Sequence, residues 1–376
     1  MKVTLERNHL LKSLGHVHRV VERRNTYPIL ANVLLEASPS GLQLRATDLD
    51  IEVTETVPAM VDAEGATSVP AHTLFEIVRK FSDGAEVHLE TQPSDNGDDQ
   101  MRITSGRSQF FLACLSPEGF PDLKSGDFSN DFSIAASDFA GLISRTQFAI
   151  STEETRYYLN GIYFHGHEVD GKPMLRAVAT DGHRLARADF EAPAGAATIP
   201  GIIVPRKTVG EIQKLLEGVE GDVRVEISET KIRLTAGSVV LLSKLIEGTF
   251  PDYERIMPKN NDKEMVIDRA SFSAAVDRVS TIASDRGGKV VKLVVADGVL
   301  ELTVTNPDHG TANEEVPVSF DHDRFEIGFN AKYLLDILSQ IGSQSATFLF
   351  GDSGSPTLVG DQDDAAAAYL IMPMRV

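Results

Sequence analysis

Three carboxylates at alternate positions, Asp48, Asp50 and Glu52, form the group in this sequence most suited to chemistry. Alternate side chains of a strand lie on one face, and clustered carboxylates can hold the divalent metal ion of a nuclease. The matching positions of two later segments do not keep these ligands: they are Asp181, His183 and Leu185, and then Asn306, Asp308 and Gly310. We therefore interpret the cluster as a solvated turn, with a metal-dependent nuclease as the alternative.

The other reactive side chains also lack a catalytic context. His16 and His18 are two residues apart, so they point to different faces of a helix and cannot share a metal ion. No serine or cysteine in a recognisable context accompanies His183. Cys114 lies in an apolar stretch, where a small buried hydrophobic residue is expected. With no glycine-rich phosphate loop either, the sequence predicts no catalytic residue, no metal site and no cofactor.

Two patterns of apolar residues with the spacing of an amphipathic helix occur along the sequence, and each occurs three times. The first is Leu10, Leu14, Val17 and Val21, then Phe139, Ile143, Thr146 and Ile150, then Phe272, Val276, Val279 and Ala283. The second is Leu74, Ile77 and Phe81, then Val209, Ile212 and Leu216, then Leu334, Ile337 and Ile341. Between the helices run alternating strand-and-turn segments. Asp48, Asp181 and Asn306 fall at matching points of these segments.

The repetition predicts an α+β fold of three structurally similar repeats, each with two helices and about eight short strands. The boundaries are placed at 1–127, 128–257 and 258–376. A chain of 376 residues is long enough for three domains, and copies of this size are whole domains rather than solenoid turns. Three similar domains in a row can curve, and if a head-to-tail contact closes the curve, the product is a ring.

The charge is acidic overall but unevenly distributed. The chain has 36 basic and 55 acidic residues and a formal charge of −19, whereas a protein held on nucleic acid by bulk attraction should be basic. The predicted helices span residues 6–24, 70–80, 138–147, 205–217, 268–286 and 330–341. Together they carry a net charge of +5, which leaves −24 for the remainder.

This distribution favours an acidic exterior with weakly basic helices on one side. A ring with its helices inside would encircle DNA without gripping it, because few phosphate contacts oppose sliding. Two alternatives stay open: mixed helical charge without a function, and an acidic scaffold or peptide-binding protein that never surrounds DNA.

The sequence gives no sign of a membrane or of an oxidising compartment. No apolar run is long enough to cross a bilayer, and the first residues are amphipathic rather than signal-like. The single cysteine excludes an internal disulfide. We expect a cytoplasmic protein with no membrane contact.

Several longer strings, in the same order, resemble the bacterial sliding clamp family, the β subunit of DNA polymerase III. They are Asn25–Leu30, Arg156–Gly161, Ala179–Ala186, Val204–Lys207, Phe250–Tyr253, Ile327–Asn330 and Met372–Arg375. The resemblance covers essentially the whole chain. It implies a non-catalytic processivity factor, a homodimeric ring around duplex DNA that tethers the DNA polymerase III α subunit, a clamp loader and other proteins with a clamp-binding motif.

The resemblance also implies three groups of functional residues. DNA contacts are expected at Arg24, Tyr157, Tyr158, Arg206 and Lys207, although the neighbouring carboxylates of Glu153 and Glu154 should weaken the tyrosine contact. Contacts between the two subunits are expected at Phe110, Leu112 and Ile282.

The third group is a groove for partner peptides, in which adaptable methionines accompany a few polar anchors. It consists of Leu159, Thr180, Gly182, His183, Arg184, Leu185, Pro251, Arg255, Ile256, Asn330, Tyr333, Leu370, Met372, Pro373, Met374 and Arg375.

Overall fold

The computed structural model describes residues 1–23, 26–94, 99–124, 126–283 and 290–376. These residues form two compact units. Unit 1 comprises Met1–Phe139, Pro193–Ala196 and Lys207–Leu245, and unit 2 comprises Ala140–Ala192, Ala197–Arg206 and Ile246–Val376. Each unit is described by itself.

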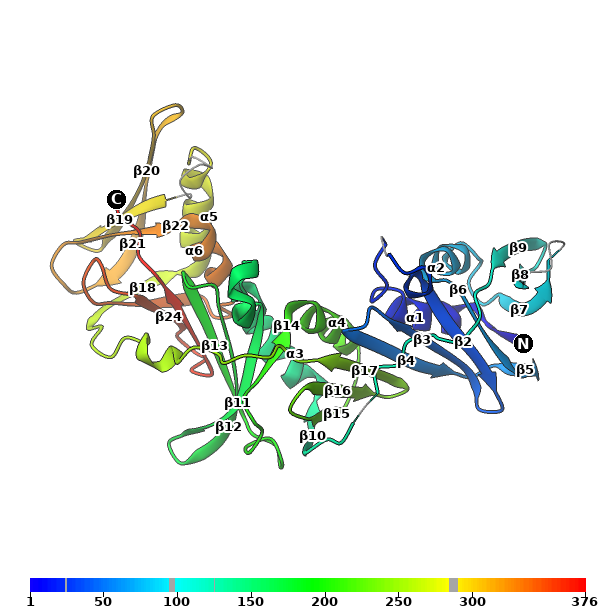
Figure 1. Cartoon of the computed structure of the whole chain (residues 1–376). Coiled ribbons are helices and arrows are strands. Elements are labelled where there is room, and N and C mark those ends of the chain that lie inside the picture. The colour runs from blue at the N-terminus through cyan, green and yellow to red at the C-terminus, as the bar shows by residue number, and fades with distance from the viewer. Residues whose placement is uncertain (24–25, 95–98, 125, 284–289) are drawn as a thin grey trace. The chain divides into compact units, whose positions relative to one another are not determined.

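Unit 1 contains two antiparallel sheets with the orders β5-β1-β7-β8-β9 and β10-β15-β16-β17-β4-β3-β2-β6 (Figure 1). Buried and half-buried residues alternate along strands such as β8 and β16, as expected when one face of a sheet is more fully covered than the other. The strands are β1 (Lys2–Glu6), β2 (Asn32–Ser38), β3 (Gly41–Thr47), β4 (Ile51–Val57), β5 (Met60–Ala63), β6 (Gly65–Pro70), β7 (Glu86–Pro93), β8 (Asp99–Ser105), β9 (Ser108–Ala113), β10 (Asn130–Ala135), β15 (Asp222–Ile227), β16 (Lys231–Ala236) and β17 (Val239–Lys244).

Helices α1 (Arg7–Val17) and α2 (Ala71–Arg79) lie side by side in unit 1 and pack on strands β2, β3, β4 and β6 (Figure 1). The Glu6 side chain caps α1 by accepting hydrogen bonds from the backbone N–H groups of Asn8 and His9. The apolar stripe of α1 is buried against the strands. Helix α4 (Arg206–Leu216) and the 3₁₀ helix η1 (Pro28–Ala31) also have apolar residues that are buried.

Unit 2 is built on one antiparallel sheet of order β14-β11-β12-β13-β25-β24-β23-β18-β21-β20-β19-β22. Its strands are β11 (Gly161–Val169), β12 (Lys172–Thr180), β13 (Arg184–Glu191), β14 (Ile202–Pro205), β18 (Lys263–Asp268), β19 (Val290–Ala296), β20 (Val299–Asn306), β21 (Gly310–Phe320), β22 (Phe325–Asn330), β23 (Ser345–Phe350), β24 (Thr357–Asp361) and β25 (Ala367–Ile371).

Helices α5 (Arg269–Ser280) and α6 (Ala331–Leu338) pack against each other in unit 2. Asp268 caps α5 and Asn330 caps α6, each by accepting a hydrogen bond from a backbone N–H of the first turn. Helix α3 (Ala136–Thr146) begins in unit 1 and ends in unit 2. The short 3₁₀ helices are η2 (Gln147–Ala149), η3 (Glu154–Leu159) and η4 (Tyr253–Arg255).

Three segments of similar content follow one another along the chain, as the sequence predicts. In the described residues each has two α-helices, and the strands number nine, eight and eight. The compact units combine strands of neighbouring segments, because β4 pairs with β17 in unit 1 and β13 pairs with β25 in unit 2. Edge-to-edge pairing therefore extends each sheet across a predicted domain boundary.

The first helix of each segment is shorter than the apolar spacing predicts. Val21, Ile150 and Ala283 all lie beyond the ends of α1, α3 and α5. Val21 is nevertheless buried, with 3% of its surface exposed. An apolar residue that packs just after a helix continues the stripe without continuing the hydrogen-bond ladder, so the periodicity overestimates the helix length. Of the described helices, none has the length and apolar character to cross a membrane.

Candidate functional site

A hydrogen-bonded turn between β12 and β13 forms the centre of the candidate site in unit 2. The Thr180 hydroxyl donates to the Arg184 carbonyl oxygen at 2.7 Å and accepts from the Gly182 N–H at 3.1 Å. Asp181 Oδ1 accepts from the N–H groups of His183 and Arg184 at 2.9 and 3.0 Å. Gly182 has a φ of 86°, a left-handed conformation that glycine adopts without steric cost. The turn is thus fixed by its own side chains.

Arg184 connects this turn to two other elements. Its guanidinium donates to Asp181 Oδ2 at 3.1 Å, to the Phe148 carbonyl oxygen at 2.7 Å and to Asp336 on α6. It also lies over the rings of Phe148 and Tyr333, at 5.1 and 4.5 Å from their centroids. The His183 ring stacks on Tyr333 at 6.0 Å. These contacts define one wall of a pocket of about 560 Å³.

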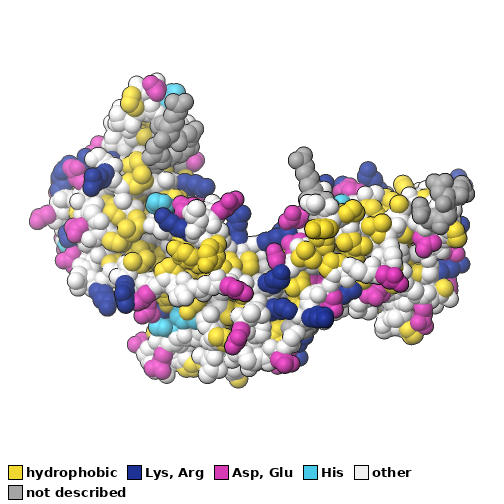
Figure 2. All heavy atoms as spheres, in the orientation of Figure 1, with side chains coloured by type: hydrophobic (Ala, Val, Ile, Leu, Met, Phe, Trp, Pro, Cys, Tyr) yellow, Lys and Arg dark blue, Asp and Glu magenta, His cyan; other side chains and the backbone are white. Residues whose placement is uncertain are grey.

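An apolar cluster begins at the next residue of β13. Leu185 belongs to a buried group against which Met372 packs, and this group consists of Leu159, Val178, Leu185, Ile203, Phe250, Tyr253 and Leu370. Figure 2 shows apolar side chains gathered on this unit, in the region where Figure 1 labels β13. The turn therefore separates a charged pocket from an apolar surface, which is formed by the partly buried side chains packed on that cluster: Tyr158, Tyr163, Ile246, Met257 and Met372.

The C-terminal tail, residues 372–376, follows β25 along this surface. The Met372 N–H donates to the His183 carbonyl oxygen at 2.9 Å, and the Met374 N–H donates to the Gly328 carbonyl oxygen at 2.8 Å. The side chains of Met372, Pro373 and Met374 are half-buried, whereas Arg375 is exposed. Two backbone hydrogen bonds thus hold the tail while its methionine side chains stay accessible.

A buried polar chain fixes Tyr253 at the back of the apolar cluster. His165 Nδ1 lies 2.8 Å from the Gly166 carbonyl oxygen, which can only accept, so Nδ1 carries the proton and Nε2 accepts from the Tyr253 hydroxyl at 3.0 Å. The Tyr253 oxygen in turn accepts from Arg176 Nη1 at 3.2 Å, and Arg176 forms a two-pronged ion pair with Asp189. Burial, followed by the nearby Arg176 charge, lowers the pKa of His165.

The structure brings together part of the predicted peptide groove. His183, Arg184 and Tyr333 line the pocket, whereas Leu159, Leu185, Leu370 and Met372 form or contact the apolar cluster. Thr180 and Gly182 shape the turn, and Asn330 caps α6. Pro251, Arg255 and Ile256 are exposed on and beside η4, where Arg255 pairs with Asp252 at 2.7 Å.

Sequence reasoning missed several residues that build this site. Asp336 and Phe148 hold Arg184, and Tyr253 joins the cluster to the polar chain. Asp181 carries the turn, although its recurrence at the position of Asp48 was a visible signal. Asp336 and Phe148 lie 152 and 36 residues from Arg184, so no local pattern could indicate them.

The predicted DNA contacts have different surroundings. Tyr157 is 55% exposed and its neighbour Tyr158 packs on the apolar cluster, with their rings edge to face at 5.6 Å. Glu153 pairs with Arg156 at 3.2 Å, which offsets one of the two carboxylates of this loop. Arg206 lines the charged pocket of unit 2. Arg24 lies outside the described residues.

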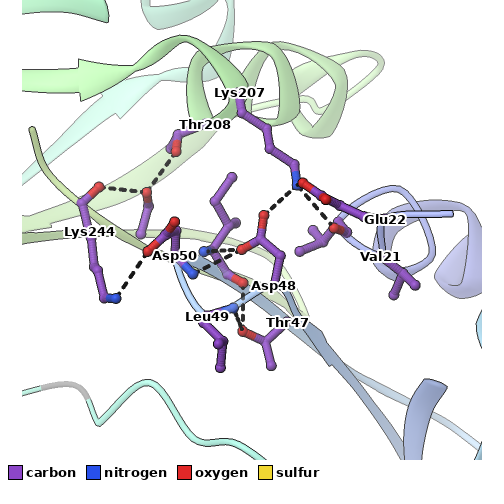
Figure 3. Close-up of polar contacts among 12 residues, drawn as sticks. Val21, Glu22, Thr47, Asp48, Leu49, Asp50, Lys207, Thr208 and Lys244 are labelled. Atoms are coloured by element: carbon purple, nitrogen blue, oxygen red, sulfur yellow. Dashed lines mark hydrogen bonds and ion pairs between the residues drawn. The ribbon is translucent and has the colours of Figure 1, made fainter. Parts of the chain in front are cut away.

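Lys207 occupies a polar network in unit 1 (Figure 3). Its Nζ donates to Asp48 Oδ2, to Glu22 Oε1 at 3.3 Å and to the Val20 carbonyl oxygen at 3.2 Å. Burial alone would lower the pKa of Lys207, but the two carboxylates more than offset this and raise it. The ammonium is therefore permanently charged and committed to internal partners.

The structure also shows what the three carboxylates at alternate positions do. Asp48 Oδ1 accepts from the N–H groups of Asp50 and Ile51 in the turn between β3 and β4 (Figure 3). Glu52 is buried in β4 and accepts from the Leu123 N–H at 3.2 Å, and burial raises its pKa. No cluster of metal-ligating side chains occurs in the part of the chain that the structure describes.

The predicted subunit contacts lie at an edge and near a helix end. Phe110 and Leu112 are on β9, the last strand of its sheet, and Phe110 is 39% exposed. Ile282 follows α5, half-buried, and its carbonyl oxygen accepts from Asn306 at 2.8 Å. Cys114, expected to be buried, is only half-buried because the edge strand before it is largely exposed.

Comparison with known proteins shows which protein family this chain belongs to. Three models of the DNA polymerase III beta subunit match the chain: the N-terminal domain over residues 1–124, the central domain over 133–252 and the C-terminal domain over 254–375. The beta sliding clamp of Caulobacter vibrioides is 50% identical over 377 residues, and that of Escherichia coli K12 is 37% identical over 379, each with both chains fully covered. The chain belongs to the family of bacterial sliding clamps.

Solved structures of sliding clamps agree in fold along the whole chain. The clamp of Bartonella birtlesii bound to griselimycin matches with a TM-score of 0.96 at 51% identity, and that of Pseudomonas aeruginosa bound to griselimycin with 0.93 at 37%. Both chains are fully covered in each comparison. The protein therefore has the three-domain clamp fold and acts as a processivity clamp of DNA polymerase III, a non-catalytic subunit. The nuclease alternative is wrong.

The Lys207 network predicts a measurable effect on the stability of the clamp. Lys207→Met leaves Asp48, whose side chain is 9% exposed, without its cation. We expect a loss of about 1 kcal/mol, which lowers the midpoint of thermal unfolding by about 2–4 °C. Circular dichroism measures this midpoint. Asp48→Asn in the same chain should recover most of the loss, because the amide oxygen still accepts the two turn N–H groups.

Lys244→Met is the matched control. Lys244 pairs with Asp50 of the same turn at 3.0 Å, but these side chains are 50% and 74% exposed. Solvent screens such a pair, so the midpoint should change by less than about 1 °C. Equal shifts in the two variants would show that burial of Asp48 does not matter.

The polar chain at Tyr253 predicts a pH-dependent stability. Unfolded His165 takes up a proton near pH 6.5, whereas in the folded clamp its pKa is lowered. Its contribution is therefore complete above about pH 6.5 and is lost as the pH falls toward the lowered value. We expect the thermal midpoint to drop as the pH is lowered below about 6.5, and His165→Gln to reduce that drop. His309→Gln, at an exposed position between β20 and β21, should leave the drop unchanged.

Proposed function

We propose that two copies of this clamp join head to tail into a ring around duplex DNA, without regard to base sequence. The ring would tether the DNA polymerase III α subunit, the clamp loader and other proteins with a clamp-binding motif, in the cytoplasm. Its three domains are taken as 1–127, 128–257 and 258–376. Retention on DNA would come from enclosure, which suits a chain with a formal charge of −19.

Partner proteins would dock by a short apolar peptide on the surface formed by the apolar cluster and the C-terminal tail. The observation that carries this proposal is the combination of a fixed turn with half-buried methionines beside it. Methionine side chains adapt to ligands of different shape, and the rigid turn supplies polar groups at constant positions. Two related clamps, from Bartonella birtlesii and Pseudomonas aeruginosa, have been solved with griselimycin bound, and we propose that the same compound occupies this surface here.

The subunit contact would form at strand β9. An edge strand presents unpaired backbone groups, and here it also presents exposed Phe110 and Phe111. Leu112 of the same strand and Ile282 near the end of α5 would complete an apolar contact between different surfaces of two copies. Such a heterologous contact closes into a ring when the rotation allows it.

Contact with DNA would be light. Tyr157 is exposed and can stack on or donate to the nucleic acid, and Tyr158, Arg206, Lys207 and Arg24 remain candidates. Lys207 is the weakest of the described candidates, because two carboxylates already hold its ammonium. A few weak phosphate contacts fit a ring that slides.

Retention on circular DNA tests the enclosure. Loaded by a bacterial clamp loader with ATP onto nicked circular DNA, the clamp should stay bound at moderate salt, because a closed ring cannot leave a circle. Cutting the circle should release it, and gel filtration of clamp with DNA measures both states. Binding that ignores cutting and fades with salt would show ordinary electrostatic attraction instead.

Removal of residues 372–376 tests the docking surface. We expect the truncated clamp to lose griselimycin binding by at least about tenfold, measured by calorimetry, because Met372 no longer covers the apolar cluster. The dimer should persist in native mass spectrometry, since β9 and α5 are untouched. Full affinity in the truncated clamp would remove the tail from the site, and loss of the dimer would indicate a wider defect.

A further inference from the structure

In the charged pocket next to the apolar cluster, some charged side chains have partners of opposite charge and others do not. Six charged residues line it: Glu153, Asp181, Arg184, Arg206, Lys332 and Asp336. Three of these side chains are carboxylates and three are permanent cations. Formal charge is therefore zero, and the contacts decide what the pocket can bind.

Each carboxylate of the pocket already has a cationic partner. Asp181 and Asp336 both form an ion pair with Arg184, and Glu153 forms one with Arg156 at 3.2 Å. All three nitrogens of the Arg184 guanidinium have an acceptor, because Nη2 donates to the Phe148 carbonyl oxygen.

Two cations of the pocket remain. Among the contacts of the described residues, neither Arg206 at the start of α4 nor Lys332 in the first turn of α6 has a side-chain partner. Both are exposed.

We propose that Arg206 and Lys332 form an anion-binding subsite. It would hold an acidic side chain of the docked peptide, next to the apolar residues of that peptide. This inference rests on the proposed docking function. His183 lines the pocket, and its carbonyl oxygen accepts from the N–H of Met372, which packs half-buried on the apolar cluster, so one extended peptide that lies along His183 can reach both.

The wall of this subsite is formed before the ligand arrives. Arg184 is held between the rings of Phe148 and Tyr333 and by three acceptors, and Tyr333 stacks on His183. A fixed wall costs little ordering entropy on binding, and its arginine is already paired with two carboxylates, so the ligand is left to Arg206 and Lys332. On this inference Arg206 binds the peptide instead of the DNA considered above.

The test is a selection followed by a paired affinity measurement. Short peptides of random sequence, displayed on phage, are selected on the full-length clamp, and one enriched apolar peptide is synthesised with glutamate or glutamine at its flanking acidic position. Fluorescence polarisation then gives the affinity ratio of the two peptides. We expect the wild-type clamp to favour glutamate by about two- to tenfold, the range for two exposed ion pairs.

The double variant Arg206→Ala with Lys332→Ala should bring the ratio close to one and leave affinity for the glutamine peptide unchanged. Lys80→Ala with Lys172→Ala, which removes two exposed lysines elsewhere, should keep the wild-type ratio. An unchanged ratio in the first variant overturns the subsite. The same holds if that variant instead loses retention on circular DNA, because Arg206 would then contact phosphate. Selection of no apolar peptide at all would overturn the docking function itself.

Discussion

The turn Thr180–Arg184 and its counterpart Thr47–Ile51 supply the constraint on which both described sites depend. In each, the threonine hydroxyl donates to the carbonyl oxygen four residues later, at 2.7 and 2.8 Å. In each, aspartate Oδ1 accepts two backbone N–H groups. The second oxygen of that carboxylate is thereby aimed out of the turn toward a cation, which is Arg184 in one copy and Lys207 in the other.

One backbone shape therefore serves two purposes. In unit 1 the cation comes from α4, so the turn joins that helix to strands β3 and β4. In unit 2 the cation is the last residue of the turn itself, and it extends to Asp336 on α6. The third position is left-handed in both, with Gly182 at a φ of 86° and Leu49 at 80°. Leucine is strained there, so the surrounding hydrogen bonds must hold it in place.

The sequence predicted the repetition because burial imposes it locally. Alternating strands, two amphipathic helices and the matching aspartates at 48 and 181 are all visible in short windows. The helix ends were not, since Val21 is buried without being helical. The strand pairs that extend each sheet, β4 with β17 and β13 with β25, were not predicted either. The residues of an edge strand do not indicate which distant strand will pair with it.

The residues predicted for the peptide groove lie in two environments that the sequence did not separate. Arg184 and Leu185 are neighbours in sequence and were placed in one groove, yet Arg184 is held by acceptors in a polar pocket and Leu185 belongs to an apolar cluster. The pairing depends on Phe148 and Asp336, which only the tertiary fold brings near. Likewise, nothing in the sequence separates Lys207, held by internal carboxylates, from Arg206, which is not.

The two sides of the proposed docking surface are held by different contacts, and Gly328 shows how the C-terminal tail is kept in place. A Cβ at position 328 would lie 2.3 Å from Val376 Cγ1 and 2.8 Å from the Met374 carbonyl oxygen. Only glycine lets the tail lie directly on β22, where one backbone hydrogen bond holds it. The opposite side is locked by Arg184 and by the Tyr253 chain. A surface that accepts many partners, as proposed here, would need both properties, because fixed polar groups would set the register of a peptide while methionines adjusted to its apolar side chains.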